Sequence, residues 1–538
     1  MLEDQKAKRR EIHRRSMIIT GMMTTAAGVA AAYLALGPGG PLPSWMYGRW
    51  TGKSEETEAP ARPAPMLVRF QPWTPSALAQ AAAGDRLVLL SLVLSGSRPC
   101  AMMDRGAFAD IQVASMISQR FTAIRTDADE RPDLALRYGG RGWPSTSLLM
   151  PNGEPLSEGH FMGPRMFLEW AGLVEASFRK KGAGGAALSG RGWRRLEALA
   201  KGDVPLSRGG IEDQARERMK SWNRGSGGRW SRFRDIRLIF AHGPDWARKL
   251  AISQAESALK LEDPAWGGFF RYAKGPGWKN LEYEKKLGDQ ADAAAALCWV
   301  DQEACRRVLN YVEGFLKAPE GGYYAGQGSE LELAHAVMPG SEYFGLPSER
   351  RKALGRPFVD RRIFTGPSAR MAAVVLASSA ATNSMRAHAL KTLDRLWERA
   401  SDQGRASRHL GAGPWGLLED QLGLAEAGLA AHGATRSPAY LARASSSFRF
   451  MESELLGAEG AYYDRLPTGE LLAVVDRLAV PALNLDALLI IDGLERALAS
   501  DHPLRPSLAR RRRQLALWLS RHGKTLSAGE LLALLNFI

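Results

Sequence analysis

The chain has 538 residues and a mass of 58.7 kDa, with 45% hydrophobic and 24% charged residues, a composition typical of folded globular proteins that excludes a disordered chain. The length exceeds what one hydrophobic core usually fills, so two or more domains are expected. A net charge of +15 raises the question of an anionic partner, and the three cysteines show no CxxC or zinc-ligand spacing.

The first segment has the pattern of a membrane anchor. Residues 1–16 form a basic tail, and residues 17–37 form an uncharged stretch long enough to span a bilayer as a helix. Because positive charge precedes this stretch, we expect the N-terminus in the cytoplasm, a single pass through the inner (plasma) membrane, and the bulk of the chain in the periplasm or outside the cell. The alternative is a cleaved export signal, because Arg14 and Arg15 precede the apolar run.

Residues 38–65 are rich in Pro and Gly and are expected to form an extended tether. Residues 66–180 then follow the order β-α-β-α-β-β-α. An apolar strand at 87–94 precedes a helical pattern over 100–119, and further strands are expected at 121–127 and 145–150. This order predicts a thioredoxin-like α/β domain, in which Pro144 after Trp143 would follow a cis peptide bond.

The second half of the chain has a different pattern. Residues 181–235 are interpreted as a basic connector, residues 236–500 as an all-α domain, and residues 501–538 as a basic C-terminal helix. Helical patterns alternate with glycine-aromatic loops that begin at Gly267, Gly321 and Gly460. A loop type that recurs between helix pairs predicts an (α/α) barrel of about six hairpins.

Several short motifs, in order, carry a family resemblance. They are SGSRPCAMMDRGAF at 95–108, FTAIRTDADERPD at 121–133, RGWPSTSLLMPNGEP at 141–155 and GGFFRYAKGPGWKNLEYEKKLGDQA at 267–291. Over residues 66–500 the chain resembles the spermatogenesis-associated proteins, which combine a thioredoxin-like domain with a six-hairpin barrel. The resemblance implies an α/β thioredoxin-like domain followed by an all-α six-hairpin toroid.

The thioredoxin-like motif departs from the family pattern at its nucleophile. In the family the loop reads C-x-x-C, with a Phe eight residues past the second Cys. Cys100 and Phe108 keep that interval, so Ser97 stands where the first Cys belongs. A serine hydroxyl is not a thiolate and forms no mixed disulfide, and one thiol cannot complete a dithiol cycle. Two interpretations stay open: Cys100 is an inert thiol with Ser97 as a helix N-cap, or Cys100 acts as a single thiol that captures a partner.

The barrel motifs also depart from the family pattern. In the first barrel motif Gly275 replaces Asp, Leu281 and Glu282 replace Pro and His, and Gly288 replaces Tyr. In the second motif Gly328 and Glu330 replace two aspartates. Related barrels, among them sugar epimerases and glycosidases, place His and carboxylates in a central funnel for proton transfer. The resemblance implies a set of funnel candidates, some of them aromatic residues for stacking on sugar. They are Glu282, Glu284, Asp289, Trp278, Tyr323, Tyr324, Glu419 and Asp420.

These departures indicate a membrane-anchored pseudoenzyme, that is, a non-catalytic binding, scaffold or assembly subunit, with enzymatic activity not expected. Two alternatives stay open: a thiol-disulfide redox protein that uses Cys100, and carbohydrate binding or epimerisation in the barrel. The nine histidines have no paired spacing, so neither a metal nor a cofactor is expected.

The positive charge is concentrated in four segments outside the predicted domain bodies: 1–16, 179–201, 216–237 and 503–524. Such a distribution disfavours nucleic acid. It indicates that the basic segments contact anionic lipid headgroups or a protein partner in or near the membrane. Lipid is also expected around residues 17–37, the predicted anchor. Cys298 and Cys305 lie about 10 Å apart along a helix, too far for a disulfide unless the helix breaks, so buried packing is expected.

Overall fold

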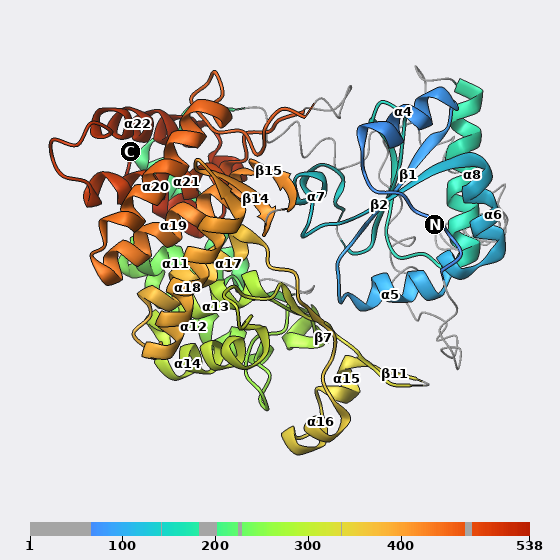
Figure 1. The fold of residues 1–538 in the computed structure, drawn as a ribbon, viewed down its shortest axis with the longest axis horizontal. Helices are drawn as coiled ribbons and strands as arrows, with labels where there is room; N and C mark the ends of the chain where they lie inside the picture. Colours follow the sequence, from blue (N-terminus) through green and yellow to red (C-terminus); the bar gives the residue numbers. More distant parts are fainter. Residues whose placement is uncertain are drawn as a thin grey trace, which may run out of the picture.

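The computed structural model describes residues 66–140, 142–181, 202–223, 229–334, 336–410, 412–468 and 476–538. The predicted tail, anchor and tether over residues 1–65 lie outside this part of the chain. Within it, no helix is both long and apolar enough to cross a membrane. An α/β domain and a larger helical domain lie side by side, with helix α7 (Pro132–Tyr138) on the side of the α/β domain that faces the helical one (Figure 1).

The α/β domain is built on one four-stranded sheet. Its strands are β1 (Leu87–Val93), β2 (Phe121–Asp127), β3 (Ser145–Leu149) and β4 (Pro155–Gly159). They lie in the order β2-β1-β3-β4, with β1 parallel to β2 and antiparallel to β3. Both faces of β1 are buried, which explains why it reads as a continuous apolar run.

Helices cover both faces of this sheet. Leu87 and Leu89 face a core shared with α6 (Ile111–Arg120) and α8 (Pro164–Lys181), whereas Val88 and Leu90 face α4 (Pro75–Ala83) and α7. Helix α5 (Arg98–Arg105) begins directly after the loop that follows β1. The Trp143–Pro144 peptide bond is cis, as the sequence predicted. The thioredoxin-like topology is therefore confirmed.

The helical domain is a closed ring of helix pairs. The helices of the inner ring, each packed on the next with the last back on the first, are α11 (Phe233–His242), α13 (Leu287–Val300), α17 (Thr365–Ala377), α19 (Leu418–Thr435), α21 (Pro481–Ala497) and α23 (Ala528–Leu534). The helices that pack outside them are α12 (Asp245–Ala258), α14 (Gln302–Tyr311), α18 (Asn383–Ala400), α20 (Pro438–Phe450), α22 (Arg505–Arg521) and α10 (Arg208–Lys220). The six-hairpin barrel is confirmed.

The barrel is larger than the predicted range of 236–500. Helix α10 pairs with α23, so one hairpin is made from two helices at opposite ends of the domain. Ile211, Ala215 and Met219, spaced by four residues, are buried in the barrel core together with Leu531. The predicted connector and the predicted C-terminal helix therefore both contribute to the ring, and α23 closes it.

The helical half is also not purely α, which corrects the expectation of an all-α domain. Short strands form small sheets in the loops between helices. One sheet holds β5 (Arg229–Trp230), β6 (Tyr272–Gly275) and β7 (Lys279–Glu282), another holds β8 (Lys285–Lys286), β9 (Gly326–Gln327) and β12 (Val359–Asp360), and a third holds β13 (Ser401–Asp402), β14 (Arg405–His409) and β15 (Ala412–Trp415). Strands of two to five residues are too short to show an alternating pattern, so no sequence signal predicts them.

The glycine-aromatic loops have a structural explanation. Gly268 has φ +74°, and a Cβ there would lie 2.5 Å from the Tyr311 ring, so only glycine fits. The following Phe269 exchanges two backbone hydrogen bonds with the Gln290 side chain, at 2.7 and 2.9 Å. Asn484 holds Tyr462 in the same way, at 2.7 and 2.9 Å. These residues therefore hold the loops of the scaffold in place.

Cys298 and Cys305 are joined in a disulfide, which corrects the expectation of simple packing. The helical pattern breaks at Asp301, whose φ of −147° and ψ of 97° separate α13 from α14. Because the chain reverses there, the two Cα atoms lie 5.2 Å apart.

Candidate functional site between the thioredoxin-like domain and the barrel

The acidic run at 127–133 forms ion pairs that join the thioredoxin-like domain to the barrel. Asp127 pairs with Arg362 at 2.8 Å, Asp129 with Lys286 at 2.9 Å, and Asp133 with Arg465 at 2.8 Å. Burial opposes ionisation of Asp133, but the neighbouring arginines prevail and lower its pKa to about 2. The run that carries part of the family resemblance is therefore an interdomain contact.

A fully buried ion pair lies beside this run. Arg137 of α7 donates to both carboxylate oxygens of Asp464, at 2.6 and 3.2 Å, and neither side chain is appreciably exposed. Arg137 also donates to the carbonyl of Asp476, at 2.7 Å. A buried charge needs such partners, so this pair requires the two domains to stay docked.

The position of the missing nucleophile lies inside the same interface. Ser97 is 4% exposed, and its side chain lies beside the Cys100 thiol and the Glu284 carboxylate of the barrel, where it opposes the rise in pKa that burial causes in both groups. Ser97 occupies the N-cap position of α5, but its side chain makes no capping bond, which corrects that expectation. Cys100 is 4% exposed, and burial raises the pKa of its thiol to about 11. The thiol is therefore protonated and inaccessible at neutral pH.

Two of the sequence departures also belong to this contact. Gly328 lies against Gly96, and the Ser329 backbone N–H donates to the Gly96 carbonyl at 3.2 Å. Glu330 pairs with Arg98 at 2.9 Å and with Arg105 at 3.2 Å, both on α5. Residues that replace family aspartates in the barrel thus hold the loop and helix that would carry a thioredoxin active site.

A cavity of about 260 Å³ lies where the acidic run meets the barrel. Its wall is formed by Asp129, Pro132, Arg271, Lys286, Leu287, Gly288, Asp289, Ala325, Phe364, Pro367, Arg408 and Glu419. Asp129 and Pro132 come from the thioredoxin-like domain, so that domain covers the part of the barrel where the inner helices α13, α17 and α19 begin. The candidate site is therefore shared between the two domains.

Asp289 is the unusual carboxylate of this wall. Its Oδ2 atom is buried without a hydrogen-bond partner among the described residues. Burial raises the pKa of Asp289 to about 6, although Arg271 acts in the opposite direction. Asp289 can therefore change its protonation state near neutral pH.

Arg408 joins the remaining charges on this side of the barrel. It donates to Glu419 at 3.1 Å, to Asp420 at 2.9 Å, and to the backbone carbonyl of Asp129 at 2.7 Å. Burial raises the pKa of Asp420 to about 7, and Asp420 also accepts from the Gly366 backbone N–H at 2.7 Å. Arg408 thus links the α19 carboxylates of the barrel to the thioredoxin-like domain.

Ion pairs continue along the inner helices. Arg234 and Arg370 both contact Asp486, at 3.0 and 3.1 Å, and Arg370 and Arg237 both contact Glu426, at 3.4 and 3.1 Å. Four inner helices contribute these side chains. The interior of the ring is therefore polar and cross-linked by ion pairs.

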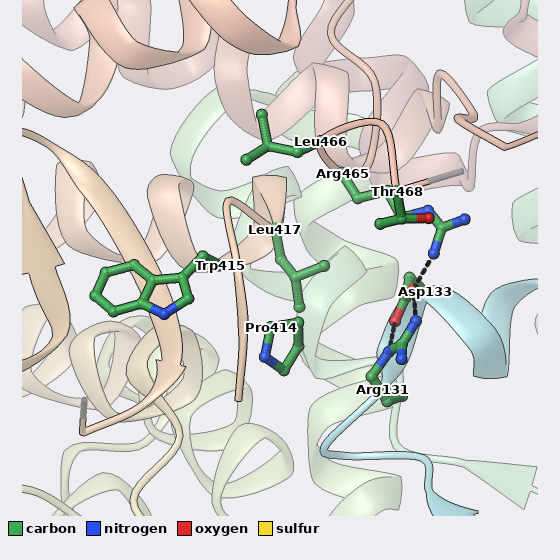
Figure 2. Close-up of a pocket in the computed structure, with 8 residues that line it drawn as sticks. All are labelled: Arg131, Asp133, Pro414, Trp415, Leu417, Arg465, Leu466 and Thr468. Atoms are coloured by element: carbon green, nitrogen blue, oxygen red, sulfur yellow. Dashed lines mark hydrogen bonds and ion pairs between the residues drawn. The ribbon is translucent and has the colours of Figure 1, made fainter. Parts of the chain in front are cut away.

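A second cavity, of about 300 Å³, lies at the same domain boundary (Figure 2). Asp133 stands between Arg131 and Arg465 on one side, and the apolar side chains face them from the other. The apolar residues are Pro414, Trp415, Leu417 and Leu466. Asp133 already forms an ion pair with each of the two arginines.

The structure separates the funnel candidates into two groups. Asp289 and Glu419 line the first cavity, while Glu284 and Asp420 contact its arginines, Glu284 pairing with Arg271 at 3.2 Å. The other four candidates lie elsewhere: Glu282 pairs with Lys274, Trp278 donates to Ser257, Tyr323 is in the core, and Tyr324 packs against it. None of these three aromatic residues lines either cavity, so the expected stacking surface for sugar is not there.

Sequence reasoning missed the cationic part of the site. Arg271, Lys286 and Arg408 were not among the candidates, and Asp129 stood out only as part of a motif. For Arg271 a signal existed, since it keeps its place in a family motif, whereas Arg408 lies in a short strand with no motif. Among the described residues, no group of His, Cys, Asp and Glu is placed to hold a metal ion.

Only two of the four arginines at positions 510–513 of α22 are exposed to solvent. Arg511 is buried and pairs with Glu452, with hydrogen bonds at 2.7 and 3.1 Å, and Arg512 contacts Glu495 at 3.2 Å. Arg510 and Arg513 are exposed. The expected basic surface on this helix is therefore narrower than the run of four arginines suggests.

The fold and the site together define a class of protein: a thioredoxin-like domain, here with a serine at position 97, docked as a cap on a six-hairpin barrel. Residues 61–177 match the family described as Thioredox_DsbH, protein of unknown function, DUF255. The chain is similar to spermatogenesis-associated protein 20 of Homo sapiens, with 22% identity in an alignment of 351 residues that covers 54% of this chain and 43% of the human protein. It is also similar to an uncharacterized protein of Caenorhabditis elegans, with 24% identity in an alignment of 302 residues that covers 49% of this chain and 41% of the relative. The matches thus span about two fifths of each relative.

Solved structures resemble the two parts separately. A cellobiose 2-epimerase from Bacillus thermoamylovorans has 10% identity and a TM-score of 0.40, and the match covers 54% of this chain and 75% of the epimerase. A structure titled DsbH Oxidoreductase has 14% identity and a TM-score of 0.19, with 25% of this chain and 98% of that one covered.

Proposed function

We propose that this protein is a non-redox binding or scaffold protein in which the thioredoxin-like domain serves as a docked cap on the barrel. One observation carries the proposal: Ser97, at the nucleophile position, is buried and lies beside both Cys100 and Glu284 of the barrel. Thiol-disulfide exchange needs an exposed thiolate that a substrate can reach. Here the position holds a hydroxyl and faces the other domain.

The anchor and the location outside the cytoplasm form part of the same proposal. Residues 17–37 would hold the protein in the inner membrane, with the cap and the barrel on the far side from the basic tail. A protein partner in or near the membrane would then bind the docked unit. The support for this part is the charge and hydropathy pattern of residues 1–37.

Carbohydrate binding in the barrel is a second candidate. It is supported by the position of Asp289 and Glu419 in the wall of one cavity. Epimerisation or hydrolysis would use two titratable groups of this kind. Trp278, Tyr323 and Tyr324 do not line this cavity. This weakens the candidate, because these were the residues expected to stack on sugar.

Labelling of Cys100 tests the main proposal. We expect the full-length protein to react with a small aromatic disulfide at pH 8 far more slowly than the same protein unfolded in guanidinium. Ser97→Cys, which restores C-x-x-C, should stay inactive in reduction of insulin, because the new thiol would face Glu284. Rapid labelling of native Cys100, or disulfide reductase activity of either protein, would refute the proposal.

A pull-down from solubilised membranes tests the redox alternative separately. Partners captured by the wild-type protein should also be captured by Cys100→Ser, because the thiol takes no part in binding. Loss of a partner in Cys100→Ser, with the protein still folded by circular dichroism, would favour capture through a mixed disulfide.

A further inference from the structure

Asp289 stands apart from the other charged groups around the interdomain cavity. The structure shows no hydrogen bond to its carboxyl group among the described residues, and its Oδ2 atom is buried. A buried carboxylate without a partner is costly, and such groups are found where a ligand or an ordered water supplies the missing donor. Asp289 as a residue is only half-buried and lines the cavity, so a donor can approach its carboxyl group from there.

The cations of the wall are already committed to other groups. Lys286 donates to Asp129 and to the Ser95 carbonyl, both at 2.9 Å. Arg408 donates to the Asp129 carbonyl, Glu419 and Asp420. These two cations therefore stabilise the contact between the domains. Because their donor groups already have acceptors, they offer an anionic ligand few hydrogen bonds.

The balance of charge favours a cation in the cavity. The wall carries three cations, Arg271, Lys286 and Arg408, and three carboxylates, Asp129, Asp289 and Glu419. Two more carboxylates, Glu284 and Asp420, contact these arginines directly. When all groups are ionised, the carboxylates outnumber the cations by two, so a positive ligand is attracted and a negative one repelled.

The shape of the site limits the ligand to a small one. A Cβ at Gly288 would meet nothing within 4 Å, so there is free space directly beside Asp289. The guanidinium groups of Arg362 and Arg408 lie 5.0 and 4.9 Å from the centre of the Phe364 ring. Because these arginines occupy that ring, the ligand is held by polar contacts and shape rather than by stacking.

We propose that the cavity between the cap and the barrel binds a small ligand that carries a protonated amine, whose N–H groups donate to the Asp289 carboxylate. The remainder of the ligand occupies the space beside Gly288 and Leu287. This inference rests on the proposed function, because the cavity exists only while the cap is docked. Charge-assisted hydrogen bonds of this kind are stronger than neutral ones, so the amine should dominate the affinity.

Three probes of one shape and different charge test the proposal: cyclohexylamine, cyclohexanol and cyclohexanecarboxylate. Binding to the full-length protein would be measured by isothermal titration calorimetry near pH 8, where Asp289 is ionised. We expect cyclohexylamine to bind at least about tenfold more tightly than the other two, and Asp289→Asn to weaken it by about tenfold, a difference of about 1.4 kcal/mol. Glu282→Gln, a carboxylate outside the cavity, should leave its affinity unchanged.

Equal affinity for the three probes, unchanged amine affinity in Asp289→Asn, or no heat from cyclohexylamine at millimolar concentration would each overturn the proposal. Hydrogen exchange at residues 95–100 separates this failure from that of the proposed function. Slow exchange without amine binding would leave the docked cap intact and reject only the ligand. Fast exchange would show that the cap is not docked, and would reject the proposed function itself.

Discussion

Gly96 of the thioredoxin-like domain and Gly328 of the barrel touch backbone to backbone. A Cβ on Gly96 would lie 2.9 Å from the Gly328 Cα atom, and a Cβ on Gly328 would lie 3.3 Å from the Gly96 Cα atom. Gly96 also has φ +80°, which disfavours any side chain there. Gly96 belongs to the loop that precedes the nucleophile position of a thioredoxin. This loop therefore contacts the barrel at Gly328, where the family pattern has an aspartate.

Gly328→Asp, which restores the family residue, should loosen the cap. The new carboxylate would lie close to the carbonyl oxygens of Phe358 and Gly96, whose distances from a Cβ at 328 are 3.4 and 3.5 Å. We expect faster hydrogen exchange at 95–100 and a loss of about 1–3 kcal/mol in the free energy of unfolding. Gly209→Asp is the matched control, because Gly209 is exposed and a Cβ there meets nothing. Equal exchange in both variants would contradict the role of the Gly96–Gly328 contact.

Asp464→Asn should destabilise the protein strongly. The change leaves the Arg137 guanidinium buried without its ionic partner, and breaking a buried pair in this way costs about 3–5 kcal/mol. Chemical denaturation gives the value directly. Glu349→Gln removes the exposed pair with Lys352 and should cost less than about 0.5 kcal/mol. Similar losses in the two variants would argue against docking through Arg137.

Leu531→Ala tests whether the last helix belongs to the barrel. Leu531 is fully buried in the core that α23 shares with α10 and α11, so we expect a loss of about 2–5 kcal/mol. Leu517→Ala, on the exposed side of α22, should change the free energy of unfolding by about 0.5 kcal/mol or less. A negligible effect of Leu531→Ala would mean that the ring closes without α23.

The pKa of Asp289 is raised to about 6 from an ordinary 3.8, so the free energy of unfolding should depend on pH through this group. The folded protein holds this proton more tightly than the unfolded chain does. The contribution to stability is therefore complete below about pH 4 and is lost as the pH rises through about 6.

Asp289→Asn removes that loss. The variant should be more stable than the wild type at pH 7 by about 3 kcal/mol, and the difference should shrink toward pH 4. Urea titrations at several pH values measure it. Carboxylates with lowered pKa values, such as Asp133, contribute the opposite slope to both proteins, so only the difference between the two reports on Asp289. A difference that is independent of pH would contradict the assignment.

We propose that α22 contacts anionic lipid through its two exposed arginines, Arg510 and Arg513. The double variant Arg510→Ala, Arg513→Ala should lower binding to vesicles that contain anionic lipid, by about 1 kcal/mol for each charge near the surface, and the effect should fade as salt increases. Arg511→Ala should leave vesicle binding unchanged and lower stability instead, because Arg511 pairs with Glu452 in the barrel. Co-sedimentation with vesicles distinguishes these outcomes.

Local patterns in the sequence were sufficient for the two domains and for most of their helices. The apolar run at 87–94 predicted a buried strand, which the structure shows at Leu87–Val93. The interval between Cys100 and Phe108 placed Ser97 where the family pattern has its first Cys. Patterns of this kind work because burial and turn formation depend on residues a few positions apart. The ring closure was missed for the opposite reason: α10 and α23 lie at opposite ends of the domain, and neither shows by itself which helix it will pack against.

The sequence by itself thus determined that position 97 supplies no thiolate, since a serine has none in any fold. Only the tertiary structure decided what the remaining charges do. Asp133 and Arg465 lie more than 300 residues apart in the sequence, and so do Arg137 and Asp464. Each pair forms its ion pair only because the two domains meet in the interface. The same holds for Asp289, whose proton affinity depends on the burial that the docked cap and the surrounding helices create. Electrostatic energy depends on distance and on solvent, and both are properties of the folded molecule.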